Sequence, residues 1–68
     1  MINITITSIK ADSSEEMERA GFVPGETAYY IIRESGKRIS EYYHSEYGAL
    51  IEAWEIVKKY GFTLVEPW

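Results

Sequence analysis

Cysteine is absent from this chain of 68 residues, so neither disulfides nor thiolate metal ligands can stabilise it. The length is that of one domain, near the lower limit at which a single apolar core suffices. No segment approaches the ~20 apolar residues of a membrane span. The N-terminal stretch MINITITSIK alternates and does not form the unbroken apolar run of a signal peptide. We therefore expect a single cytoplasmic domain, residues 1–68, with no membrane partner.

Basic side chains are scarce. The chain carries 7 Lys and Arg against 11 Asp and Glu, a formal net charge of −4. Phosphate binding usually requires a concentrated positive field, which this composition does not supply. An acidic surface instead favours solubility or a basic partner. Hydrophobic residues make up 46% of the chain and aromatic residues 15%, which is too rich for disorder and predicts a folded core.

The N-terminal half predicts a strand, a short helix and a turn. Ile2, Ile4 and Ile6 alternate with polar residues, which is typical of a half-buried strand. The polar residues 12–14 can cap a short helical turn that runs through Glu18. Residues 23–26, Val-Pro-Gly-Glu, predict a type II turn, because proline supplies the second position and glycine the third.

A β-hairpin is predicted around Ser35-Gly36, with strands at about residues 26–34 and 37–43. A two-residue loop places these pairs opposite each other: Glu34 and Lys37, Ile32 and Ile39, and Tyr29 and Tyr42. One sheet face then carries Ala28, Tyr30, Ile32, Ile39, Glu41 and Tyr43. The other carries Tyr29, Ile31, Arg33, Arg38, Ser40 and Tyr42. We assign the second face to solvent because it holds both arginines.

The main helix is predicted over residues 45–60, with Ser45 as its N-cap and Gly61 at its C-terminal end. Its apolar arc is centred on Leu50, Ala53, Trp54 and Val57, so we expect Trp54 in the core. The arc is wider than a helix on a single sheet needs, which predicts homodimerisation. A short fourth strand follows at residues 62–66. The fold class is therefore α+β, a mostly antiparallel sheet of about four strands with this helix packed on one face.

The solvent face of the hairpin is the sharpest candidate for a binding surface. Aromatic residues and arginine are enriched at protein interfaces, so we expect a protein partner there. The candidate partner-binding residues are Tyr29, Arg33, Lys37, Arg38 and Tyr42. The alternative is a nucleic-acid partner, stacked on the tyrosines and contacted by the arginines, which the net charge disfavours. A solvated face with cross-strand aromatic pairs remains the simplest interpretation.

Residues 28–60 carry a pattern of Tyr30, Gly36-Lys37-Arg38, Tyr43, Ser45 and Ala49. This order of aromatic strand, basic turn, second strand and capped helix resembles the AP2-like domains at the N-termini of phage integrases. The resemblance implies a small sheet with a helix packed behind it. It also implies DNA contacts from the sheet, which would carry over to Arg33, Lys37 and Arg38.

A second surface is acidic. Glu15, Glu16 and Glu18 cluster near Asp12, which is typical of a solvated helix start. Joined by Glu26 and Glu34, the cluster could also mimic a phosphate backbone. In size, charge and lack of catalytic motifs the chain resembles small acidic phage inhibitor proteins, including some anti-CRISPR inhibitors.

Catalytic and metal motifs are missing. His44 is the single histidine, so neither a triad nor a histidine metal site can be assembled around it. The acidic residues lack the spacing of a calcium loop, and there is no glycine-rich phosphate loop. We therefore expect a non-enzymatic regulatory or inhibitor protein, encoded by a phage or another mobile element, with no cofactor, no metal and no catalytic residue.

Overall fold

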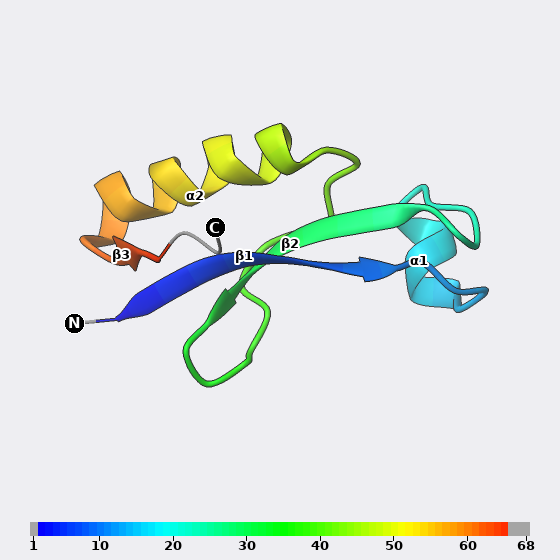
Figure 1. Cartoon of the computed structure of the whole chain (residues 1–68), viewed down its shortest axis with the longest axis horizontal. Helices are drawn as coiled ribbons and strands as arrows, with labels where there is room; N and C mark the ends of the chain where they lie inside the picture. The colour runs from blue at the N-terminus through cyan, green and yellow to red at the C-terminus, as the bar shows by residue number, and fades with distance from the viewer. Residues whose placement is uncertain (1, 66–68) are drawn as a thin grey trace.

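The computed structural model describes residues 2–65, which form an α+β fold with one main helix (Figure 1). The elements in chain order are β1 (Asn3–Lys10), α1 (Glu15–Arg19), β2 (Thr27–Arg33), α2 (Glu46–Tyr60) and β3 (Thr63–Leu64). Helix α2 lies along one face of the sheet, and α1 lies at the end of the sheet where β1 finishes.

The sheet is mixed and has three strands in the order β2-β1-β3. β1 pairs antiparallel with β2 along most of its length and parallel with β3 at Asn3 and Ile4. The prediction of about four mostly antiparallel strands is therefore met only in part. Residues 38–43 contact the outer edge of β2 through two isolated bridges and form no regular strand. Glu66, the last residue of the predicted fourth strand, lies outside the described residues.

The hairpin has a different register from the predicted one. The Gly36 N–H donates to the Arg33 carbonyl at 2.8 Å, and Gly36 has a φ of 91°. A type I turn followed by a left-handed glycine makes a three-residue loop, Glu34 to Gly36, instead of two residues. Ile32 therefore faces Arg38 rather than Ile39. A two-residue bulge within residues 39–42 then sets Tyr29 opposite Tyr43 rather than Tyr42.

This register divides the side chains differently between the two faces of the sheet. Ile31 is fully buried with Ile4 and Ile6 beneath α2, and Tyr29 packs against the same cluster. The assignment of the Tyr29, Ile31 face to solvent is therefore wrong. A shift of one residue moves the side chains of residues 37–43 to the other face relative to β2, so Arg38 and Tyr42 leave the face that Tyr29 and Ile31 share.

Two small cores occupy opposite faces of the sheet. Beneath α2, six buried residues pack together: Ile4, Ile6, Ile31, Ala49, Ala53 and Ile56. On the opposite face, α1 and the segment after it cover a second cluster of Ala11, Met17, Phe22 and Ala28. The predicted turn at residues 23–26 is confirmed, since the Glu26 N–H donates to the Val23 carbonyl and Gly25 has a φ of 95°.

Helix α2 begins and ends as predicted but is rotated about its axis. The Ser45 side chain accepts from the Gly48 N–H, and Gly61 closes the helix in the left-handed conformation. The buried residues are Ala49, Ala53 and Ile56, whereas Trp54 is 49% exposed. The expectation that Trp54 lies in the core is therefore wrong. Alanines let the helix approach the isoleucines of the sheet closely, and an indole in their place would need more room than the close-packed layer leaves.

Candidate protein-binding surface

Tyr42 is the centre of an aromatic and charged cluster on the sheet face opposite α2. The Arg38 guanidinium carbon lies 4.4 Å from the centre of the Tyr42 ring. Tyr30 and Phe22 meet this ring edge-on, with centroids at 5.3 Å and 6.3 Å. The Tyr42 hydroxyl donates to Glu16 Oε1 at 2.9 Å. We call these five residues, Glu16, Phe22, Tyr30, Arg38 and Tyr42, the Tyr42 cluster.

The bulge in residues 39–42 positions this cluster. The Ser40 hydroxyl accepts from the Ile31 N–H at 2.9 Å, so a side chain replaces the carbonyl that a regular strand would offer. The Arg38 side chain donates to the Ser40 carbonyl and is thereby folded back along its own strand. Arg38 and Tyr42 thus lie on the same side of the sheet, four residues apart, with the guanidinium over the ring.

The electrostatics of the cluster depend on Glu16. Its carboxylate accepts from Tyr42 and also lies 3.5 Å from Arg38 Nη2. Burial raises the pKa of the Tyr42 hydroxyl above its ordinary value of 10.0, and the hydrogen bond to Glu16 raises that pKa further. Tyr42 therefore stays protonated and continues to donate to Glu16 throughout the neutral range.

The predicted acidic surface adjoins the cluster. Ser14 caps α1 by accepting from the Met17 N–H, and Glu15, Glu16 and Glu18 occupy the first turn. Glu15 forms an exposed ion pair with Arg19, and Glu16 turns towards Arg38 and Tyr42. Hydrogen bonds from Ser14 lower the pKa of the Asp12 carboxyl. The two surfaces that the sequence predicts separately therefore meet at Glu16.

The five predicted partner-binding residues are divided among three places. Arg38 and Tyr42 lie together in the Tyr42 cluster, and Lys37 is exposed in the loop beside them. Tyr29 packs against the core beneath α2. Arg33 lies on that side too, since it pairs with Ile4 and lines a groove against α2.

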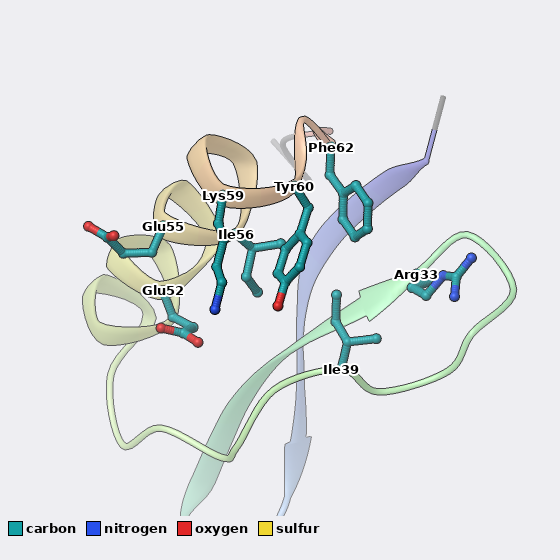
Figure 2. Close-up of a pocket in the computed structure, with 8 residues that line it drawn as sticks. All are labelled: Arg33, Ile39, Glu52, Glu55, Ile56, Lys59, Tyr60 and Phe62. Atoms are coloured by element: carbon teal, nitrogen blue, oxygen red, sulfur yellow. The ribbon is translucent and has the colours of Figure 1, made fainter.

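The groove between Arg33 and the C-terminal half of α2 has a volume of about 600 Å³ and is shown in Figure 2. Its apolar lining comes from Ile39, Ile56 and Phe62, and its charged rim from Arg33, Glu52, Glu55 and Lys59. The Arg33 side chain points away from Lys59, and its Nε atom is buried with no hydrogen-bond partner. None of the described lining residues is Ser, Thr, Cys or His.

Sequence reasoning did not identify three participants in this surface. Phe22 follows a glycine and precedes the turn at residues 23–26. It therefore belongs to no alternating or helical pattern of apolar residues that would predict its burial. Tyr30 was assigned to the core face because of the predicted register. His44 stacks on Phe22 with centroids 4.0 Å apart, and its Nε2 lies 3.1 Å from the Gly21 carbonyl oxygen. The histidine thus attaches the segment after α1 to the hairpin.

Within residues 2–65, no helix is long and apolar enough to cross a bilayer, and no three His, Asp or Glu side chains are grouped to hold a metal ion. The chain matches no protein-family model, and comparison with the curated proteins and with the solved structures found no match. The interpretation of the surface therefore rests on its geometry.

Proposed function

We propose that this chain is a non-enzymatic protein-binding domain, a small regulatory or inhibitor protein that contacts its partner through the Tyr42 cluster. The proposal rests on one observation: the Tyr42 side chain is held in place at the protein surface by contacts on several sides. Those contacts come from Arg38, Tyr30, Phe22 and Glu16. Aromatic and arginine side chains dominate interface energetics, and a side chain that is already ordered loses little entropy on binding.

The chemistry around the cluster favours a basic protein partner. Glu15, Glu16 and Glu18 flank it on α1, Glu41 follows on the hairpin, and the whole chain carries a net charge of −4. Glu15 pairs with Arg19 and Glu16 pairs with Arg38, and the carboxylates of Glu18 and Glu41 add further negative charge around the apolar centre. Such a field steers a basic surface into place and disfavours an acidic one. Encoding by a phage or another mobile element belongs to the same proposal and rests on the resemblances described above.

The alternative proposal is a nucleic-acid-binding module that uses the same sheet face. Tyr30 and Tyr42 could stack on bases, and Arg38 could contact phosphate. This alternative is weaker, because Arg33 lies on the other side of the sheet and Glu16 and Glu41 lie beside Arg38. Phosphate contacts would be opposed by these carboxylates.

Affinity capture with three versions of the chain tests the proposal. The wild type, Arg38→Ala and Lys58→Ala would be immobilised and exposed to a lysate of the host, and the affinity of each captured protein would then be measured. Lys58 is exposed on α2, away from the cluster, and its substitution makes the same change in charge. We expect Arg38→Ala to weaken binding roughly tenfold or more, and Lys58→Ala to leave it nearly unchanged.

Three results would contradict the proposal. Equal binding by wild type and Arg38→Ala would move the interface elsewhere. Binding that disappears on nuclease treatment, and that is reproduced with labelled duplex or single-stranded nucleic acid at low salt, would support the nucleic-acid alternative instead. If every captured protein bound Arg38→Ala and Lys58→Ala with the same affinity, the Tyr42 cluster would not be the binding surface.

A further inference from the structure

Among residues 2–65, β1 is paired with β2 along one edge, but on the other edge it is paired only at its start, by β3. β2 pairs with residues Ile4 to Lys10, whereas β3 pairs with Asn3 and Ile4 alone. The Asn3 carbonyl accepts from Glu34, on the β2 side, and the Ile2 and Ile4 carbonyls accept from the β3 side. Backbone groups alternate along a strand, so those of Ile6, Ser8 and Lys10 point to the open edge, where no described strand pairs with them.

An exposed apolar flank of α2 lies above the same edge. Glu52, Glu55 and Lys59 line the groove against Ile39 and Arg33, on the β2 side of the sheet. At 100° per residue, the opposite flank of the helix carries Tyr47, Leu50 and Trp54, which places it on the side of β1 and β3. Tyr47 is 72% exposed and Trp54 is 49% exposed. Within the described part of the chain, backbone groups without a neighbouring strand and an exposed apolar flank of α2 therefore lie on the same side.

We propose that this side binds a second copy of the chain, with β1 antiparallel to the partner's β1 across a twofold axis at Ser8. The stretch left open by β3 runs from Ile6 to Lys10, and Ser8 is its midpoint. Antiparallel pairing about that midpoint is self-complementary, as a twofold interface requires. It extends the sheet across the dimer and keeps both α2 helices on one face, with their apolar flanks towards each other.

Charge complementarity argues for this occupant. In the register centred on Ser8, Lys10 of one copy lies opposite Ile6 of the other. Side chains at positions 6, 8 and 10 point to the α2 side, because residues two apart share a face. There, Ile6 and Ser8 line a hollow of about 240 Å³ together with Tyr29 of β2 and Glu46 at the start of α2. Each Lys10 would enter the hollow of the other copy and approach its Glu46, which makes two ion pairs.

A charge exchange tests this pairing. Lys10 and Glu46 are exposed, and neither forms an ion pair among the described residues. Lys10→Glu and Glu46→Lys should each raise the dimer dissociation constant roughly tenfold or more, through like charges across the interface. The double variant should restore it. Sedimentation over a concentration series measures the constant, and circular dichroism confirms that each variant is folded.

A single introduced cysteine gives a second measurement. The chain has no cysteine, so Ser8→Cys can form only an intermolecular disulfide. Directly opposed residues of a hydrogen-bonded antiparallel pair have Cα atoms about 5.5 Å apart, within the range that a disulfide spans. Mild oxidation should convert Ser8→Cys into a covalent dimer much faster than Ser35→Cys, an exposed position in the distal loop.

Sedimentation of the charge variants and cross-linking of the cysteine variants can each contradict the proposed dimer. A monomeric mass at the highest soluble concentration would overturn it. A dimer that Lys10→Glu leaves unchanged, or that cross-links equally well through Ser35→Cys, would place the interface away from β1 and overturn it too. The open edge of β1 and the Tyr42 cluster are separate surfaces, so neither result bears on the proposed binding of a partner protein.

Discussion

At the scale of single residues, Tyr42 joins two surfaces that lie far apart in the chain. Its hydroxyl donates to Glu16, 26 positions earlier, while its ring supports Arg38. The hydrogen bond also holds α1 against the hairpin. Removing the hydroxyl alone therefore separates the polar role of Tyr42 from the packing of its ring.

Tyr42→Phe should lower the free energy of unfolding at neutral pH by less than about 1 kcal/mol, because solvent screens the exposed Glu16 carboxylate. The pKa of Tyr42 is raised in the folded state, so its contribution is complete below the ordinary tyrosine pKa and is lost as the pH rises through the raised value. Wild type should therefore lose stability above about pH 10, and Tyr42→Phe should lose less.

Chemical denaturation at several pH values measures this loss of stability. Tyr47→Phe is the control, because Tyr47 is exposed on α2. Identical alkaline losses in wild type and Tyr42→Phe would contradict the assignment.

Arg33 and Arg38 form a matched pair with opposite surroundings. The Nε of Arg33 is buried without a hydrogen-bond partner, whereas Arg38 stacks on Tyr42 and pairs with Glu16. Replacing an unsatisfied buried polar group by an apolar one of similar shape can be neutral or stabilising. Arg33→Met should therefore leave the free energy of unfolding unchanged or raise it, and Arg38→Met should lower it by about 0.5–1.5 kcal/mol. Equal losses in thermal or urea unfolding would show that Arg33 has a stabilising partner.

At the scale of elements, the rotation of α2 about its axis decides which apolar residues stabilise the fold. Ala49 and Ala53 face the sheet because they allow close approach, and Ile56 completes that face. About half or more of each larger apolar residue is consequently exposed: 72% of Tyr47, 50% of Ile51 and 49% of Trp54. An apolar arc on a helical wheel therefore overestimates what this helix buries.

Two isoleucines on α2 test this orientation with the same substitution. Ile56 is 8% exposed and Ile51 is 50% exposed. Ile56→Val should lower the free energy of unfolding by about 0.5–1.5 kcal/mol, whereas Ile51→Val should change it by less than about 0.5 kcal/mol. Both lose one methylene and have the same backbone preference, so helix propensity cancels. Urea unfolding at low protein concentration measures both, and a larger effect at Ile51 would reverse the assigned face.

Local signals predicted the helices, the first two strands and the turn, whereas packing decided how they are arranged and left residues 38–43 without a regular strand. The cap at Ser45, the end at Gly61 and the turn at residues 23–26 depend on neighbouring residues and could be read from the sequence. The hairpin register could not, because Ser35-Gly36 suits a two-residue loop as well as a three-residue loop with Gly36 at positive φ.

The candidate site was predictable to the same limited extent. Arg38, Tyr42 and Glu16 were each identified from the sequence, but no periodicity shows that α1 folds back onto the hairpin. Arg33 was placed beside Arg38 because a two-residue loop would pair them on one face, whereas the three-residue loop sets Arg33 opposite Lys37 and Arg38 opposite Ile32. The bulge in residues 39–42, stabilised by the hydroxyl of Ser40, depends on tertiary packing that a local pattern does not contain.

At the scale of the whole molecule, the sheet has a different core on each face. The larger one joins β1, β2 and α2, and the smaller one joins α1 to the end of the hairpin. Only Met17 in α1 is buried, so α1 is attached through a small apolar area. Segments with few buried contacts open at lower free energy than the rest of a domain. We therefore expect α1 to open while the core beneath α2 stays intact.

Native-state hydrogen exchange on Ile31→Val tests this division. Ile31 is buried beneath α2 and has no part in the smaller core, so the opening of α1 leaves its contacts intact. The substitution should lower the protection of β1 and β2 amides by about 0.5–1.5 kcal/mol and leave that of α1 amides unchanged. Met17→Ala is the complementary control and should lower both, because opening of α1 and global unfolding each break its contacts. An equal fall in every amide of Ile31→Val would mean that the two cores unfold as one unit, and that α1 keeps Glu16 beside Tyr42 for as long as the domain is folded.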